Sequence, residues 1–205
     1  RANLAETLKV VAEVLQEPSF PEQELEPTRS RILASIEQAR REPTQVASTE
    51  LRRVLSPGYP KGDIRAVRTP DEMAVDLKAV TLDQIKQFHK DFFGASYGTV
   101  SVVGDFDATE IAALAKALFG SWKSAQPYVR VTEPYAKEKP ANRQFDTPDK
   151  PNAMVMTGLN VNMDDDHADY AALTLGNYVI GGSANSRLFN RLRQKEGFSY
   201  GAGSQ

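Results

Sequence analysis

The residues with the clearest potential for chemistry lie near the end of the chain, where a short basic helix is predicted between Gly182 and Gly197. Arg193 falls in the last turn of this helix, and Tyr200 stands seven residues later on a strand-like run. Two such donors, held side by side, could form hydrogen bonds to a carbonyl oxygen or to a developing oxyanion. A simpler interpretation stays open, in which the basic side chains form a solvated helix face and Tyr200 packs within the fold.

Other reactive groups are sparse in the sequence. His89 and His167 lie far apart and fit no zinc-binding spacing, and no nucleophile elbow or phosphate-binding loop is recognisable. We expect His89 to lie on a helix in a core-facing or half-buried position. The aspartates at 164–166 are expected to cap a helix, with a divalent-ion site there as the open alternative. The chain contains no cysteine, which excludes disulfides and thiolate chemistry.

The composition is that of an ordinary globular protein of 205 residues, long enough for one large domain or two smaller ones. A net charge of −2 and the lack of a basic stripe argue against nucleic acid as a partner. No apolar run approaches the roughly 18–20 residues needed to cross a bilayer, so no membrane role is predicted. The chain opens on Arg1 without a methionine and closes on Gln205 inside a strand-like run. We therefore expect a piece of a longer protein, whose compartment the sequence leaves open.

Periodicity predicts the elements that must position these residues. Thr81 and Gln84 form a capping box for a helix that ends near Phe93, and Asp107 and Gly120 bound another helix. Further helices are predicted at about 22–41, 44–55 and 166–180, and strands at about 97–103, 153–159 and after Gly197. Helices and strands that follow one another without strict alternation favour an α+β fold.

Three segments carry a resemblance to a known family. The strings Ser186-Arg187-Leu188-Phe189, Leu192-Arg193 and Glu196-Gly197-Phe198-Ser199-Tyr200 resemble a signature in the C-terminal half of the pitrilysin/insulinase zinc peptidases, the inverzincins. The segments 103–107 with 118–122, and 18–26, are similar to other parts of that family. The resemblance implies an α+β fold of sheet-plus-helices domains. Residues 1–125 would be the latter half of a degenerate domain, 126–146 a linker, and 147–205 the first half of the next homologous domain.

The resemblance also assigns roles to four residues. Arg193 and Tyr200 match a family pair that contacts the substrate carbonyl beside the scissile bond. Thr28 and Ser35 match two glutamates of the catalytic domain, one of which is a zinc ligand. Because hydroxyl groups are poor substitutes for a carboxylate at zinc, we expect no catalytic residue and no metal in this chain, and zinc in another domain of the parent.

The function that the resemblance implies is the non-catalytic, substrate-binding portion of a multidomain zinc metalloendopeptidase that hydrolyses peptides or unfolded proteins. Its partners would be a peptide substrate and either other domains of the same parent chain or a homologous catalytic subunit. The alternative is an inactive binding or scaffold subunit of the same family, which docks presequences or assembles complexes without proteolysis. An unrelated α+β ligand-binding module is the third possibility.

Overall fold

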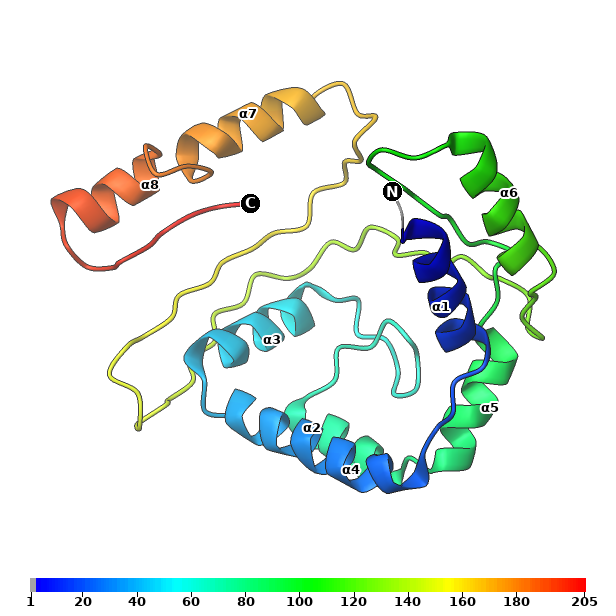
Figure 1. Ribbon diagram of the computed structural model, residues 1–205. Coiled ribbons are helices and arrows are strands. Elements are labelled where there is room, and N and C mark those ends of the chain that lie inside the picture. The colour runs from blue at the N-terminus through cyan, green and yellow to red at the C-terminus, as the bar shows by residue number, and fades with distance from the viewer. Residues whose placement is uncertain (1–2) are drawn as a thin grey trace. The chain divides into compact units, whose positions relative to one another are not determined.

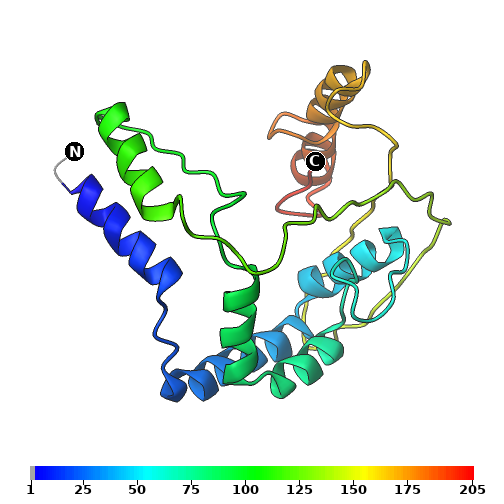
Figure 2. The same ribbon diagram turned by 90° about the vertical axis from the view of Figure 1, so that its right-hand side faces the viewer.

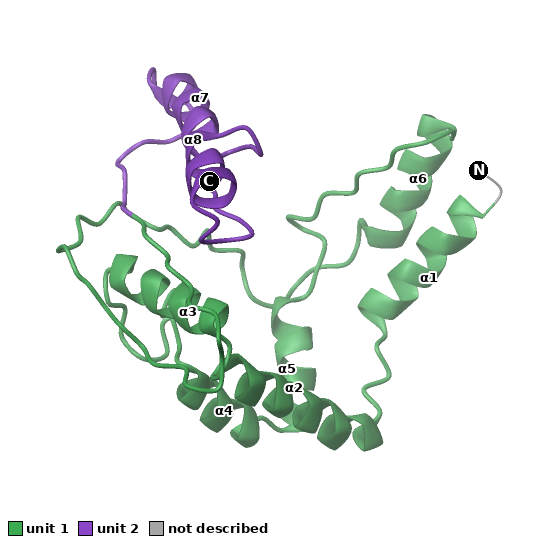
Figure 3. Cartoon of the chain, turned by 90° about the vertical axis from the view of Figure 1, so that its left-hand side faces the viewer, with its two compact units in different colours: residues 1–158 green, residues 159–205 purple. Residues whose placement is uncertain are grey.

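The computed structural model describes residues 3–205, which divide into two compact units, with unit 1 ending at Gly158 and unit 2 covering Leu159–Gln205 (Figure 3). Every regular element in the described residues is helical. Unit 1 contains α1 (Leu4–Gln16), the 3-10 turn η1 (Glu22–Glu24), α2 (Leu25–Ala39), α3 (Pro43–Leu55), α4 (Pro70–Ala79), α5 (Leu82–Phe92) and α6 (Ala108–Phe119). Unit 2 contains α7 (Tyr170–Ile180), α8 (Arg187–Phe189) and the π-helical segment η2 (Asn190–Lys195). None of the described helices is both long and apolar enough to span a membrane.

The prediction of an α+β fold is wrong for this structure, because residues 3–205 contain no strand and no sheet. The segments at 97–103 and 153–159 and the tail after Gly197 are irregular backbone, and Val103 is fully exposed. Alternating apolar residues show that a segment can present two faces. A strand also needs a neighbouring backbone with which to exchange hydrogen bonds, and no local pattern supplies that neighbour.

Helix boundaries follow the local capping chemistry closely. The predicted capping box at the start of α5 is confirmed, with Thr81 and Gln84 bonded in both directions. Asp107 accepts a hydrogen bond from the backbone of Glu110 at the start of α6, and Gly120 follows its last residue, as predicted. A second capping box, between Thr69 and Glu72, opens α4, which sequence reasoning missed.

Two predicted helices begin later than expected. The region predicted as one helix over 22–41 is divided into η1 and α2, and Pro27 lies in the first turn of α2, where its missing N–H costs no hydrogen bond. The helix predicted from about 166 begins at Tyr170, and its N-cap Asp169 makes no side-chain capping bond. The aspartates at 164–166 precede the helix in a turn, so their interpretation as its cap is wrong.

Two helix pairs organise unit 1. Helices α1 and α6 lie side by side (Figures 1 and 2), and each carries one of the two buried apolar residues of the described chain, Ala12 on α1 and Ile111 on α6. Helices α2 and α4 form the second pair (Figure 1), joined by Arg29. Its guanidinium, on a side chain only 12% exposed, donates to the carbonyls of Leu77 and Val80 at the end of α4. Arg29 therefore supplies donors to carbonyls that the end of α4 leaves without helical partners.

Candidate functional site

The segment that carries Arg193 is held at both ends. Ser186, only 2% exposed, accepts a hydrogen bond from the backbone of Phe189 and starts α8. Gly197 takes a φ of +68°, a left-handed conformation that favours glycine, and ends η2. Just beyond it, the N–H of Phe198 donates to the carbonyl of Leu192 at 2.9 Å. These contacts fold the tail back along the helical segment.

The structure brings Arg193 to the backbone of Tyr200. The Nη1 of Arg193 donates to the main-chain carbonyl of Tyr200 at 3.0 Å, and its Cζ lies 5.0 Å from the ring centroid of Phe189. A guanidinium at this distance from an aromatic ring gains a cation–π attraction. The side chain of Tyr200 is 94% exposed. The arrangement presents an oriented guanidinium and a solvent-facing phenol from one short piece of chain.

The end of the tail is tied to α7. The N–H of Ser204 donates to the carbonyl of Gly181 at 3.2 Å, and the Nδ2 of Asn177 donates to the carbonyl of Ser204 at 3.3 Å. Gly181 is buried, and a Cβ at that position would collide with the backbone nitrogen of Ser204. Glycine is therefore required here for the close approach of the tail.

The positions expected to be a degenerate metal site lie on α2, two turns apart. Thr28 is half-buried, whereas Ser35 is exposed and its Oγ donates to the carbonyl of Ile32 at 2.8 Å. Neutral hydroxyls are weak zinc ligands, and that of Ser35 already has a backbone partner. Within residues 3–205, no three His, Cys, Asp or Glu side chains are grouped to hold a metal ion. These residues do not fit a zinc site.

His89 is half-buried on α5, as predicted. Its Nε2 lies 2.7 Å from the carbonyl of Leu15 at the end of α1, and because a carbonyl only accepts, the imidazole donates. The ring packs against Phe20 and Phe93, with centroid distances of 5.5 and 4.8 Å. His89 therefore links α5 to the end of α1.

The loop between α3 and α4 contains a charged cluster that sequence reasoning missed. Arg65 binds both carboxylate oxygens of Asp63, at 2.9 and 2.7 Å, stacks 4.0 Å from the ring centroid of Tyr59, and donates to the carbonyl of Thr132. The hydrogen bonds from Arg65 lower the pKa of Asp63 to about 2. The sequence feature that could have identified this pair is the Asp-x-Arg spacing, which allows a two-pronged ion pair between the guanidinium and the carboxylate within one turn.

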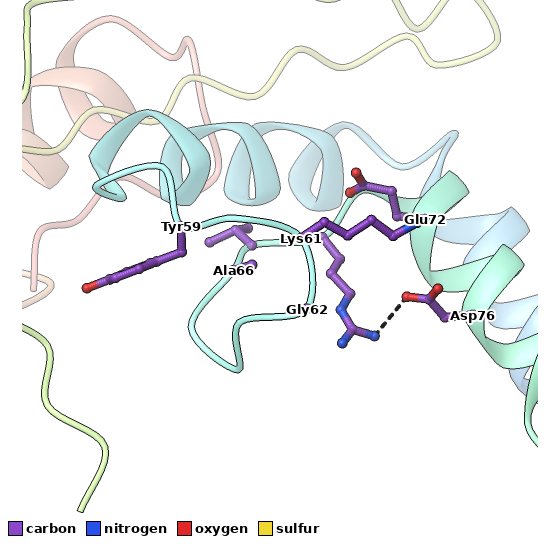
Figure 4. Close-up of a pocket in the computed structure, with 8 residues that line it drawn as sticks. Tyr59, Lys61, Gly62, Ala66, Glu72 and Asp76 are labelled. Carbon is purple, nitrogen blue, oxygen red and sulfur yellow. Dashed lines mark hydrogen bonds and ion pairs between the residues drawn. The ribbon is translucent and has the colours of Figure 1, made fainter.

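Beside this cluster lies a small open hollow of about 80 Å³, between the loop and α4 (Figure 4). Lys61, Arg68, Glu72 and Asp76 contribute side chains of both signs to it. Arg68 pairs with Asp76 at 3.0 Å. The hollow is thus lined by charges of opposite sign, and we assign it no ligand.

Comparison with known proteins identifies relatives of the whole chain. A family model described as the peptidase M16 inactive domain matches residues 79–205. The chain is 24% identical over 197 residues to the uncharacterized zinc protease YmxG of Bacillus subtilis, covering 94% of this chain and 45% of that protein.

Solved structures agree with this family. A peptidase M16 inactive domain from Pseudomonas fluorescens superposes with a TM-score of 0.71 at 26% identity, over 95% of this chain and 46% of that one. A protease from Helicobacter pylori superposes with a TM-score of 0.70 at 22% identity, over 100% of this chain and 49% of that one, and shows the fold alone. The chain thus spans about half the length of these relatives.

The resemblance drawn from the tail and from two earlier segments of the chain is confirmed at the level of the family. The family model covers more than half of the chain, including the tail with Arg193 and Tyr200. The chain therefore belongs to the peptidase M16 family of zinc proteases, and its matched segment is an inactive domain of that family.

Proposed function

We propose that this chain is the substrate-binding, non-catalytic portion of a zinc metalloendopeptidase, in which Arg193 and Tyr200 bind a backbone carbonyl of a peptide. The observation that carries the proposal is the hydrogen bond from Arg193 to the carbonyl of Tyr200. It fixes the guanidinium beside the backbone that bears an exposed phenol. Donors oriented before the ligand arrives lose little freedom when it binds.

The chemistry of the two side chains supports a peptide carbonyl as the ligand. A guanidinium has five N–H donors, and the hydrogen bond from Arg193 to the carbonyl of Tyr200 uses one of its nitrogens. No carboxylate in the described chain forms an ion pair with Arg193 within 4.0 Å, so its charge is available to an acceptor. Gly201 has open space around the position of a Cβ, which leaves room for a second backbone to approach the tail.

The proposal places zinc in another domain of the parent, where it would act as a Lewis acid on the scissile carbonyl. This chain would contribute binding and orientation of the peptide, since Thr28 and Ser35 do not fit a zinc site. We also propose that the boundary between two homologous domains lies at residues 126–146, with 1–125 before it and 147–205 after it.

Peptide affinity tests the proposal. An unstructured fluorescent peptide is titrated into the chain and into its Arg193→Ala, Tyr200→Phe and Arg187→Ala variants. Because a hydrogen bond to a charged group contributes about 1.5–3 kcal/mol, Arg193→Ala should weaken binding roughly 10- to 100-fold, and Tyr200→Phe less. Arg187, exposed on α8, is the matched control and should leave affinity unchanged. Equal affinity for all four proteins would refute the proposal.

A second function is favoured by the family description of the matched segment as an inactive domain. In that case the chain binds a peptide or a partner and the assembly cleaves nothing. The two functions can be distinguished in an M16 protein that contains this segment and is as long as the relatives. As substrate-binding residues of a peptidase, Arg193→Ala and Tyr200→Phe should lower turnover and leave the zinc content unchanged. A scaffold shows no turnover that either variant could lower.

A further inference from the structure

Two tyrosine rings lie against each other on the surface of unit 1. The rings of Tyr97 and Tyr128 are stacked, with centroids 4.6 Å apart and planes inclined by 28°. Tyr97 is 72% exposed and Tyr128 is 57% exposed. All seven tyrosines lie within the described residues, and these two alone have rings in contact with each other. The pair therefore combines close contact between two phenols with open access from solvent.

The segments that carry the pair are joined by their backbones. One segment follows α5 and the other follows α6. The N–H of Ala95 donates to the carbonyl of Trp122 at 2.9 Å, and the N–H of Gln126 donates to the carbonyl of Asp91 at 2.8 Å. Each of the two tyrosines stands two residues beyond one of these donors. The two hydrogen bonds therefore hold the stacked side chains beside each other from both segments.

A glycine permits this close approach of the two segments. A Cβ at Gly94 would collide with the backbone nitrogen of Ser124, so a larger residue would push the segments apart. The contact between the two rings thus depends on backbone geometry that is fixed only a few residues away. It is not a chance meeting of two long side chains on separate mobile loops.

We propose that Tyr97 and Tyr128 form an oxidative modification site, at which hydrogen peroxide and a haem peroxidase join the two rings by a carbon–carbon bond. Removal of a hydrogen atom from a phenol gives a phenoxyl radical, whose unpaired electron is shared with the ring carbons beside the hydroxyl group. Two such radicals combine readily when their rings are already in contact. The inference concerns unit 1 and does not depend on the peptide-binding role of Arg193.

The reaction uses one peroxide molecule for each link. The peroxide accepts one hydrogen atom from each of the two phenols and becomes two water molecules. The two radicals then form one bond between ring carbons that neighbour the hydroxyl-bearing carbons. Each of these two carbons releases its hydrogen as a proton, and each phenol oxygen takes up a proton, which restores both aromatic rings. The linked chain has therefore lost two hydrogen atoms and keeps both hydroxyl groups.

The link would close a covalent loop over residues 97–128, which contains the whole of α6. Helix α6 packs against α1, and the Nε2 of Gln16 donates to the carbonyl of Leu118 at 3.0 Å. A covalent link, like a disulfide, removes freedom mainly from the unfolded chain. Oxidation at this site should therefore make unit 1 more resistant to unfolding.

The test treats the dilute chain with hydrogen peroxide and a haem peroxidase, and follows dityrosine fluorescence and mass. The expected product is a monomer that is lighter by two hydrogen atoms. After trypsin digestion it should contain a linked pair of peptides, 91–116 and 124–130, each of which carries one tyrosine. Methionine oxidation adds oxygen and is distinguished by mass. No link, covalent dimers alone, or a link between other tyrosines would overturn the inference.

Variants sharpen the same test. Tyr97→Phe and Tyr128→Phe keep the stacked rings and remove one phenol, so each should lose the linked pair of peptides. Tyr135→Phe is the matched control, because Tyr135 is exposed on the same segment but its ring contacts no other tyrosine in the described chain, and it should leave the yield unchanged. Circular dichroism of each variant checks that its helices are retained. Equal yields from Tyr97→Phe and Tyr135→Phe would contradict the assignment of the site.

Stability measures the consequence of the link. The urea midpoint of the linked chain should lie above that of the untreated chain. Tyr97→Phe that has received the same peroxide treatment should show no such rise, which separates the effect of the link from that of other oxidation. An unchanged midpoint in the fully linked chain would show that the link does not constrain the loop around α6.

Discussion

The Nη1 of Arg193 and the main-chain oxygen of Tyr200 are 3.0 Å apart and share a hydrogen bond. This bond closes a loop over residues 193–200 that contains Gly197, whose left-handed φ of +68° allows the turn. The two groups proposed to bind a peptide therefore belong to one local structure. Any change that moves the tail should alter the orientation of both.

Gly181 is predicted to control the position of the tail. In Gly181→Ala the new Cβ would meet the backbone of Ser204, which must move away and lose its hydrogen bond to the carbonyl of residue 181. Overpacking of this kind typically costs about 1–3 kcal/mol. Amide exchange at Ser204 should accelerate in the variant. Gly201→Ala, which has open space at its Cβ, is the control and should leave that exchange rate as it is.

Arg29 is predicted to stabilise the pair formed by α2 and α4. Arg29→Met keeps much of the side-chain volume and removes the donors to the carbonyls of Leu77 and Val80. Leaving partly buried acceptors unpaired costs about 1–3 kcal/mol, so the urea midpoint should fall. Arg31→Met removes an exposed arginine of the same helix and should have little effect. Equal midpoints for the two variants would show that the capping of α4 by Arg29 contributes nothing.

The ion pair of Asp63 and Arg65 should appear in a pH titration. The hydrogen bonds from Arg65 lower the pKa of Asp63 from 3.8 to about 2. A lowered pKa means that the pair stabilises the loop fully above about pH 4 and loses this effect as the pH falls toward 2. Carboxyl chemical shifts followed by NMR measure the pKa directly. It should rise toward its ordinary value in Arg65→Met but remain low in Arg68→Met, whose arginine pairs with Asp76.

Signals within a few residues of a helix end were sufficient to predict where several of the helices begin or end. Thr81 and Gln84 cap the start of α5, and Asp107 and Gly120 stand at the two ends of α6. Each of these residues acts on the helix turn next to it, so the sequence alone predicts its role. The same chemistry at Thr69 and Glu72 was overlooked although its Thr-Pro-Asp-Glu signal is equally local. The prediction that the aspartates at 164–166 cap a helix was wrong, because three adjacent carboxylates offer several possible caps and α7 starts after all of them.

Features that depend on distant parts of the chain were not predictable in this way. Arg29 bonds to carbonyls about 50 residues away, and nothing near it in the sequence marks that role. The alternating segment at 97–103 has the pattern of a strand, but pairing needs a second backbone. The π-helical geometry around Arg193 also lacks a sequence signal, because its residues are ordinary helix formers. The tail was nevertheless recognised as the candidate site from its residue types and spacing.

The most direct measurement of the central claim is a double-mutant cycle between Arg193 and the carbonyls of a bound peptide. Each peptide carbonyl is replaced in turn by a thiocarbonyl, a weaker acceptor, and affinities are measured for the wild-type chain and Arg193→Ala. One position should show a coupling energy of about 0.5–3 kcal/mol, because both changes remove the same hydrogen bond. The same position should couple to Tyr200→Phe. Additive losses at every carbonyl would contradict the claim that Arg193 and Tyr200 bind a peptide carbonyl.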